Sequence, residues 1–395
     1  MPHLIVFSHL RWNFVFQRPQ HLLSRLARHY HVVFVEEPVH AAEAHLEHTA
    51  PLPNVDVLRP HTPVAAPGFH DDQLPVLKAL LAEHLAEHAI DDYLVWFYTP
   101  MALPLLSELA PRAIVYDCMD ELSAFKDAPK QMRQRETALL KCAHLVLTGG
   151  PSLYEAKRSL HPDVLCLPSA VDAAHFAPVD ASTRFDRTGV ATALQGAIPR
   201  PRLGFFGVID ERLDVDLVAA LADADAAWHI VMVGPVAKID PARLPQRPNI
   251  HWLGHQPYDL LPQLVADWDA CLIPFALNEA TRFISPTKTL EYMAAGKPVV
   301  STGIHDVRAM FSDVVRIADG PAAFVEACRA TLRETPLHRA ERFAAMEACV
   351  WRYSWDETAA VVHRAIEAVL ARKAPPTAVR SVATPEAGAP LPAAA

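Results

Sequence analysis

The sequence lacks a continuous apolar run long enough to cross a membrane. Although 51% of its 395 residues are apolar, charged or strongly polar residues interrupt every stretch before it reaches the ~18 residues that a spanning helix needs. The first residues, MPHLIVFSHLRW, also lack a basic leader followed by an apolar region and a small-residue cleavage site. We therefore expect a chain that is not secreted and stays in the cytoplasm.

Paired cysteines and a concentration of positive charge are missing too. The six cysteines occur singly, which indicates reduced, mostly buried thiols rather than a disulfide framework or a zinc site. The formal net charge is -9, with acidic and basic residues interspersed. Because phosphate backbones bind to concentrated basic surfaces, this balance argues against a nucleic-acid partner.

Short apolar segments rich in Val, Ile and Phe alternate with longer amphipathic segments, and this alternation occurs twice. Such alternation is typical of strands and helices in a doubly wound parallel sheet. In the first half we predict strands at residues 3–8, 32–36, 55–59, 94–98, 113–117, 145–148 and 164–167, and helices at 19–28, 72–88 and 129–141. In the second half we predict strands at residues 203–208, 229–233, 250–253, 270–274, 298–301 and 314–317, and helices at 215–223, 258–266, 286–295, 321–334 and 337–349.

Residues 178–202 lose this periodicity and are predicted to be an interdomain linker. The expected organisation is therefore a first Rossmann-like domain at 1–180, a second at 200–350, a last helix at 351–372 and a Pro- and Ala-rich, disordered tail at 373–395. Two such halves joined by a linker enclose a cleft, which is the natural place for a ligand.

The run ISPTKTLEYMAAGKPVVST, at residues 284–302, contains a helix start. Ser285 followed by proline predicts an N-cap with proline at the first helical position. Thr287 and Lys288 would then lie in the first turn, where free amides and the helix dipole favour a phosphate. Glu291 shares their helix face and could accept hydrogen bonds from ribose hydroxyls. A capped helix with a Lys288–Glu291 surface pair is the alternative.

These residues resemble the donor half of glycosyltransferase family four and its GT-B relatives, in which a glutamate placed like Glu291 binds the donor ribose. The opening run GFFGVIDERLD also resembles that family, with a small-residue turn at Gly207 and a basic residue, Arg212, near the diphosphate. Members with the full pattern carry a second glutamate eight positions before the first, where this chain has Phe283. The stereochemical course of transfer therefore stays open.

Other segments of the second half refine this expectation. WLGHQPYDLL resembles the family loop that meets the nucleobase, so His255 and Gln256 are candidate base contacts, with ordinary loop residues as the alternative. Asp214 and Asp216 form a DxD pattern, but on a predicted helix this indicates a solvated face, and we expect no essential metal. The absence of GxGxxG argues against a nicotinamide site.

The first half offers candidates for the acceptor side. The loop after the first strand places Arg11, Trp12, Gln17 and Arg18 at the carboxyl edge of that strand, facing the cleft. The alternative is a loop packed by its own aromatics, with Arg18 paired locally.

In YDCMDEL, Asp117 ends a strand and Asp120 lies in the loop beyond it. A carboxylate in a cleft can serve as a base for an acceptor hydroxyl. Asp120 is the first candidate and Asp117 the second, while helix capping by Asp120 is the alternative.

In TGGPSLYEAKR, Gly149 and Gly150 permit close backbone approach and Ser152 is the expected cap.

The opening FVFQRPQHL resembles those of bacterial polysaccharide and cell-wall glycosyltransferases, including the teichuronic-acid type, and YSWD resembles the family-four ending. The resemblance implies a GT-B fold whose last helix crosses back to the first domain. It also implies a nucleotide-diphosphate sugar donor without a separate cofactor, and a saccharide or lipid-linked acceptor. A lipid-linked acceptor would bring peripheral contact with the inner membrane. The rivals are a non-hydrolysing nucleotide-sugar epimerase and a degenerate sugar-nucleotide binding module.

Overall fold

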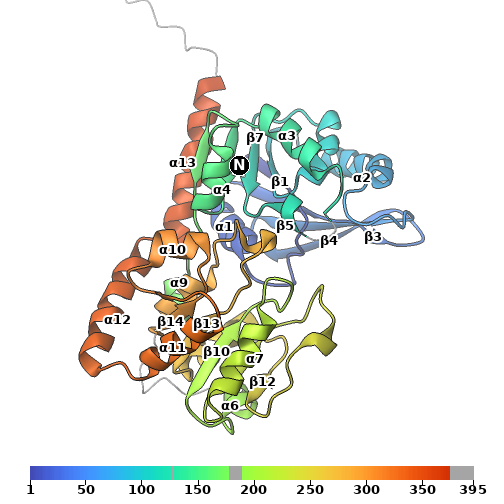
Figure 1. Cartoon of the computed structure of the whole chain (residues 1–395). Helices are drawn as coiled ribbons and strands as arrows, with labels where there is room; N and C mark the ends of the chain where they lie inside the picture. The colour runs from blue at the N-terminus through green and yellow to red at the C-terminus, as the bar shows by residue number, and fades with distance from the viewer. Residues whose placement is uncertain (126–127, 178–188, 374–395) are drawn as a thin grey trace, which may run out of the picture.

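The computed structural model describes residues 1–125, 128–177 and 189–373. Two parallel α/β units, each built on its own sheet, face one another across the middle of the molecule (Figure 1). The expected two-domain α/β architecture is thus confirmed. The predicted tail beyond Lys373 and residues 178–188 of the predicted linker lie outside the described residues. The end of the linker segment contains a short helix, α6 (Val190–Gln195).

Within the described residues the first sheet has the strand order β3-β5-β2-β1-β6-β7-β8-β9. All its neighbouring strands are parallel except β4, which pairs antiparallel with β5. The strands are β1 (His3–Ser8), β2 (His31–Glu36), β3 (Val39–His40), β4 (His45–Leu52), β5 (Val55–Thr62), β6 (Tyr93–Phe97), β7 (Ile114–Cys118), β8 (Leu145–Thr148) and β9 (Val164–Cys166).

The two faces of this sheet have separate cores because side chains alternate along each strand. In β1, Ile5 and Phe7 join the core beneath α2 (Leu74–Glu87), the 3-10 segment η2 (Pro100–Glu108) and α3 (Met132–Cys142). Leu4 and Val6 join the opposite core, beneath α1 (Arg18–Leu26) and α13 (Trp355–Lys373). Continuous apolar runs such as LIVF are therefore buried on both sides, as expected for a central parallel strand.

The sequence predicted β5 but not its antiparallel partner β4, so the hairpin was missed. The β4 segment HLEHTAPL has few apolar residues, and most of its side chains are exposed, so no buried face produces a clear alternation. Its strand conformation comes from backbone pairing with β5. The short helix α10 (His305–Phe311) was also absent from the predicted elements, whereas α4 (Pro151–Lys157) follows the glycine turn at which a helix was expected.

The second sheet is parallel throughout and has the strand order β12-β11-β10-β13-β14-β15 within the described residues. Its strands are β10 (Arg202–Phe206), β11 (His229–Val233), β12 (Ile250–Trp252), β13 (Ala270–Ile273), β14 (Val299–Ser301) and β15 (Arg316–Ile317). The helices that pack around it are α7 (Val215–Ala224), α8 (Leu261–Ala266), α9 (Lys288–Ala294), α11 (Pro321–Leu332) and α12 (Pro336–Trp351).

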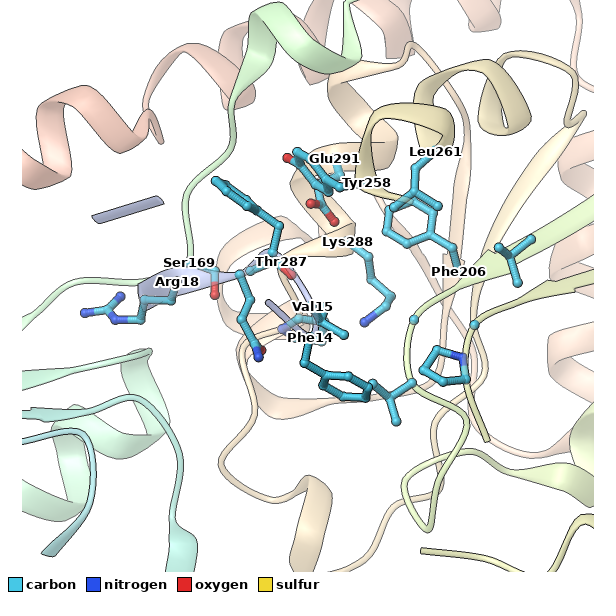
Figure 2. A pocket seen from close by; sticks show the side chains of 18 of the residues that line it. Phe14, Val15, Arg18, Ser169, Phe206, Tyr258, Leu261, Thr287, Lys288 and Glu291 are labelled. Atoms are coloured by element: carbon cyan, nitrogen blue, oxygen red, sulfur yellow. The ribbon is translucent and has the colours of Figure 1, made fainter. Parts of the chain in front are cut away.

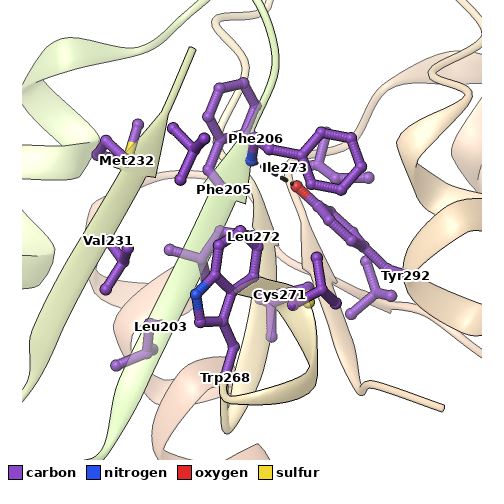
Figure 3. Packing of buried hydrophobic residues seen from close by; sticks show 14 of the residues in the cluster. Leu203, Phe205, Phe206, Val231, Met232, Trp268, Cys271, Leu272, Ile273 and Tyr292 are labelled. Carbon is purple, nitrogen blue, oxygen red and sulfur yellow. Dashed lines mark hydrogen bonds between the residues drawn. The ribbon is translucent and has the colours of Figure 1, made fainter. Parts of the chain in front are cut away.

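Aromatic side chains close the core of the second sheet (Figure 3). Trp268 is 1% exposed and packs against the backbone of β10 at Gly204, where a Cβ atom would lie 2.0 Å from its ring. Its indole N–H donates to Gln195 Oε1 at 3.0 Å. The Phe206 N–H donates to Tyr292 Oη at 2.9 Å, which ties the end of β10 to α9. Gly204 is thus required by packing in the middle of a central strand.

The last helix, α13, leaves the second unit and packs along α1 of the first (Figure 1). Trp355 at its start is 1% exposed and stacks on His21 of α1, with ring centroids 5.0 Å apart. Val362 and Ile366 continue the contact into the first core. The predicted crossover is therefore confirmed, with α13 beginning at Trp355.

Among the described residues, no helix combines the length and apolar character needed to cross a membrane.

We expect Gly204→Ala to destabilise the protein because the added methyl group collides with Trp268. Overpacking of this kind costs about 1–3 kcal/mol, occasionally more, and thermal unfolding followed by circular dichroism would measure it. Trp268→Leu alone should also destabilise the protein by leaving a cavity. In the double variant the smaller leucine makes room for the methyl group, so the combined loss should be smaller than the sum. Strictly additive losses would contradict the proposed contact.

Candidate active site

A cavity of about 490 Å³ lies between the two units, where the carboxyl ends of their strands face each other. Crevices beyond the carboxyl ends of parallel strands are the usual ligand sites of this architecture. Nine of the ten predicted site residues line it, namely Arg18, Asp120, Gly207, Arg212, His255, Ser285, Thr287, Lys288 and Glu291. The tenth, Asp117, is fully buried beneath the wall.

Lys288 and Glu291 project into the cavity from α9 (Figure 2). In the described part of the chain, neither head group has a hydrogen-bonded or ion-paired side-chain partner. The Lys288 ammonium instead lies over Phe275, 5.1 Å from the ring centroid. Burial lowers the pKa of Lys288, as does the nearby Arg212, whereas burial raises the pKa of Glu291. Buried charges without partners are costly, so Lys288 and Glu291 are available to a ligand that offers both an anion and hydroxyl groups.

The predicted surface pair is therefore wrong, because Glu291 is only 7% exposed. The predicted helix start is wrong as well. Helix α9 begins at Lys288, with Thr287 at the N-cap and no capping bond from its side chain. Ser285 is held two residues before this cap, where its carbonyl oxygen accepts a bond from Ser169 Oγ at 2.8 Å. This contact with the first unit, together with the restriction that proline places on the preceding residue, outweighs the local capping preference.

Gly207 allows the Lys288 side chain to lie against the turn after β10. It has φ +140°, and a Cβ atom there would lie 2.9 Å from Lys288 Cε. Gly234 comes equally close, since its Cβ would lie 1.9 Å from the Gly207 carbonyl oxygen. The Gly207 N–H is already donated to Val233 O at 2.9 Å. Gly207 therefore contributes space for the lysine and for a ligand rather than an amide donor.

Arg212 and Asp120 come from opposite sides of the cavity. The Arg212 guanidinium is held by Asp210, with Nη2 2.7 Å from Oδ2 and Nε 2.9 Å from Oδ1. Burial raises the pKa of Asp120 to about 6, against the opposing effect of Arg212 and Arg18. A carboxyl group with a pKa in this range can accept a proton near neutral pH. Asp120 does not cap a helix, because the following 3-10 turn (Leu122–Ala124) has Glu121 at its N-cap.

Arg18 and Asp117 form a buried ion pair beside the cavity. Arg18 Nη2 lies 2.9 Å from Asp117 Oδ1, and Arg18 Nε lies 3.0 Å from Asp117 Oδ2. Arg18 Nη1 also donates to Leu167 O at 2.8 Å, just beyond β9. Arg18 is 3% exposed and Asp117 is fully buried. The pair therefore connects the ends of strands β7 and β9 with the start of α1, and Asp117 lies outside the reach of a ligand.

The loop between β1 and α1 is anchored at both ends. Trp12 donates its backbone N–H to Glu36 Oε1 at 2.8 Å, and Arg11 Nη1 lies 3.0 Å from Glu36 Oε2. Arg11 therefore pairs inside the first unit instead of facing the cleft as predicted. At the other end, Gln17 and Gln20 form a capping box at the start of α1.

Between these anchors the loop presents apolar side chains that the sequence did not single out. Phe14 is 51% exposed and lines the cavity opposite Phe206, with Lys288 between them (Figure 2). Phe16 stacks on Tyr258 of the second unit, with centroids 5.1 Å apart. The sequence signal for their place at the cavity was their position in the loop that follows β1.

The loop that follows β12 forms the outer wall. His255 is exposed at the rim, while Gln256 donates Nε2 to Leu253 O at 2.8 Å. Tyr258, which was not among the predicted contacts, lines the cavity and stacks on His175 with centroids 4.3 Å apart. Asp214 of the DxD pattern caps α7 by accepting from the Leu217 N–H at 2.9 Å.

We expect Arg18→Met to destabilise the protein by about 3–5 kcal/mol, because it leaves the Asp117 carboxylate buried without its counter-charge. Urea denaturation would measure the loss. Arg11→Met is the matched control: Glu36 keeps Arg59 Nε at 2.7 Å, so the cost should stay below about 1 kcal/mol, as for partly exposed pairs. Equal losses in both variants would show that the buried pair has no special structural role.

Comparisons with known proteins identify relatives of this chain. Residues 200–334 match the family model described as Glycosyl transferases group 1. A putative teichuronic acid biosynthesis glycosyltransferase, TuaH of Bacillus subtilis (strain 168), is 25% identical over 273 residues, which are 65% of this chain and 68% of that protein.

Solved structures share the fold over nearly the whole chain. Sucrose-phosphate synthase from Thermosynechococcus elongatus has a TM-score of 0.72 at 14% identity, with 94% of this chain and 100% of that chain covered. Anabaena Alr3699/HepE in complex with UDP and glucose has a TM-score of 0.67 at 15% identity, over 93% of this chain and 100% of that chain. The fold is therefore GT-B, residues 200–334 are a group 1 glycosyltransferase domain, and the protein is a glycosyltransferase.

Proposed function

We propose that this enzyme transfers a sugar from a nucleoside-diphosphate sugar to a saccharide or lipid-linked acceptor in bacterial cell-surface polysaccharide synthesis, without a divalent metal. The observation that carries the proposal is the buried pair of Lys288 and Glu291, which face the cavity without partners of their own. A nucleoside diphosphate matches both groups, since it offers phosphate oxygens to the ammonium and ribose hydroxyls to the carboxylate.

The second unit is proposed to hold the donor. Lys288 and Arg212 both line the cavity from the second unit, and the charge of Arg212 helps to lower the pKa of Lys288. In this proposal they offset the negative charge that develops on the leaving diphosphate. Preorganised cations in a water-poor site can stabilise that charge, which is the work that a divalent metal does in other transferases. The aromatic ring of Tyr258 and the rim residue His255 would lie toward the nucleobase.

The first unit is proposed to receive the acceptor. Asp120 is the carboxylate of this unit that lines the cavity, and in the proposal it accepts the proton of the attacking hydroxyl. Arg18 and Asp117 act as positioning residues, because their ion pair fixes the end of β7 from which the Asp120 loop departs. The similarity to a putative teichuronic acid biosynthesis glycosyltransferase of Bacillus supports a polysaccharide product. The cytoplasmic location and the contact with the inner membrane stay predictions.

Thermal unfolding with a panel of nucleoside diphosphates and nicotinamide cofactors tests the donor site. One nucleoside diphosphate should raise the Tm, because a ligand bound only by the folded state stabilises it by about 2.7 kcal/mol at a concentration of 100 times its Kd. Lys288→Ala and Glu291→Ala should each abolish the shift. Lys141→Ala, at an exposed position of α3, is the control and should keep it.

The same panel separates the rival functions. A shift with dinucleotides alone, or with no member of the panel, would overturn the transferase proposal. If the donor sugar is converted into its epimer in the absence of any acceptor, the protein is an epimerase. Binding without any turnover, tested with a range of saccharide acceptors, would indicate a degenerate binding module.

The pH dependence of turnover tests Asp120. Since burial raises its pKa to about 6, the carboxylate is lost as the pH falls through this value, about two units above the ordinary range of an aspartate. Turnover should therefore fall below about pH 6 and reach a plateau above it. Asp120→Asn should reduce turnover by about 10²–10⁴-fold and remove this acidic limb. An unchanged limb in the variant would assign it to another group.

A further inference from the structure

The turn after β8 touches both walls of the cavity through Gly149 and Gly150. A Cβ atom at Gly149 would lie 2.6 Å from the carbonyl oxygen of Met119, the residue before Asp120. A Cβ atom at Gly150 would lie 2.9 Å from Ser285 Cβ and 2.0 Å from Asp306 Oδ2, both in the second unit. The two glycines thus stand between the Asp120 loop and the segment that leads to Lys288.

Backbone conformation does not explain the glycine at position 150. Its φ of 179° and ψ of 173° are extended values that any residue adopts. A side chain is excluded there only by the close approach of the other unit. The close backbone approach predicted for this glycine pair is therefore confirmed, and at Gly150 the approaching partner is the opposite domain.

Asp306 makes this contact polar. It lies in α10, beside α4 of the first unit (Figure 1), and is only 1% exposed. Its Oδ1 atom accepts the backbone N–H of Ser152 at 3.0 Å, while Oδ2 has no hydrogen-bond partner. The expected cap, Ser152, is thus wrong: a carboxylate from the second unit takes the free amide at the start of α4. The Ser152 hydroxyl itself is buried without a partner.

A second bond crosses the same contact. Ser169 Oγ, from the segment that follows β9, donates to Ser285 O at 2.8 Å. Ser285 stands three positions before Lys288, and both residues line the cavity. The position of the cationic wall relative to the first unit is therefore set by contacts at Gly150, Ser152 and Ser169.

We infer that Gly149, Gly150 and Asp306 are positioning residues that set the closed separation between the Asp120 loop and the Ser285–Lys288 segment. This inference rests on the proposed function for its effect on donor binding, but the contact itself is independent of it. Transfer requires the reacting groups at near-contact distance, and a displacement of about 1 Å can cost up to about 100-fold in rate. Closure also excludes water that would otherwise hydrolyse the donor. The turn acts as a spacer, and the Asp306 bond to Ser152 holds the two units against it.

The test compares Gly150→Ala, Asp306→Ala and their double variant with the wild-type chain. Small-angle scattering would report the radius of gyration, and calorimetry the Kd for whichever nucleoside diphosphate gives the largest thermal shift. Gly150→Ala should increase the radius of gyration and weaken binding about tenfold, because the methyl group displaces the cationic wall. Removing the Asp306 side chain makes room for it, so the double variant should recover part of the loss.

Two further variants make the result decisive. Ser152→Ala keeps the backbone N–H that Asp306 uses, so it should leave scattering and affinity unchanged. Ser169→Ala removes a single bond to the Ser285 carbonyl and should weaken binding by about two- to fivefold, in line with one lost hydrogen bond. The inference is overturned if Gly150→Ala folds with an unchanged radius of gyration, or if its effect adds to that of Asp306→Ala. If the wild-type chain binds none of the nucleoside diphosphates, the donor proposal fails, while the scattering result still decides the inference.

Discussion

The buried ion pair between Arg18 and Asp117 is the constraint on which the first half of the active site depends. Both charges are removed from water, so neither can leave the other without a large desolvation penalty. Arg18 starts α1 and Asp117 lies near the end of β7, and the same guanidinium binds the carbonyl of Leu167. Three segments that are far apart in the chain are thus held at one point. The loop that carries Asp120 leaves directly from it.

In the second half of the site, two buried charged side chains have no such ion-pair partner among the described residues. Lys288 and Glu291 lie on one short helix, within the cavity and without hydrogen-bonded partners in the described chain. Glycines at 207 and 234 let the backbone approach closely enough for the lysine stem to pack there. Arg18 and Asp117 of the first unit therefore neutralise each other, whereas Lys288 and Glu291 of the second unit face the cavity without such partners. In the proposed function, the donor completes this second pair.

The two halves are joined by contacts of different character. On one side, α13 packs along α1, and Trp355 stacks on His21. Tyr258 of the second unit stacks on both Phe16 and His175, so aromatic rings from both units meet on this side of the contact. On the cavity side, the contact consists of the glycine turn at residues 149–150, the carboxylate of Asp306 and the bond from Ser169 to the Ser285 carbonyl. At Gly150 the two units are so close that a Cβ atom would lie 2.0 Å from Asp306 Oδ2.

The sequence alone determined the two-domain α/β architecture, because buried parallel strands such as LIVF and GFF produce apolar runs that alternate with amphipathic helices. It also placed nine of the ten candidate residues around one cavity, since the chain positions that follow parallel strands converge at one edge of each sheet. The exposed β4 and the start of α9 were decided by pairing and by contacts between units, which local propensity does not contain. Arg18 was expected at the cleft, and only the fold revealed its buried partner 99 positions away. Tertiary packing decided how deeply each charge is buried and which charge remains without a partner. Both depend on neighbours that are remote in the chain.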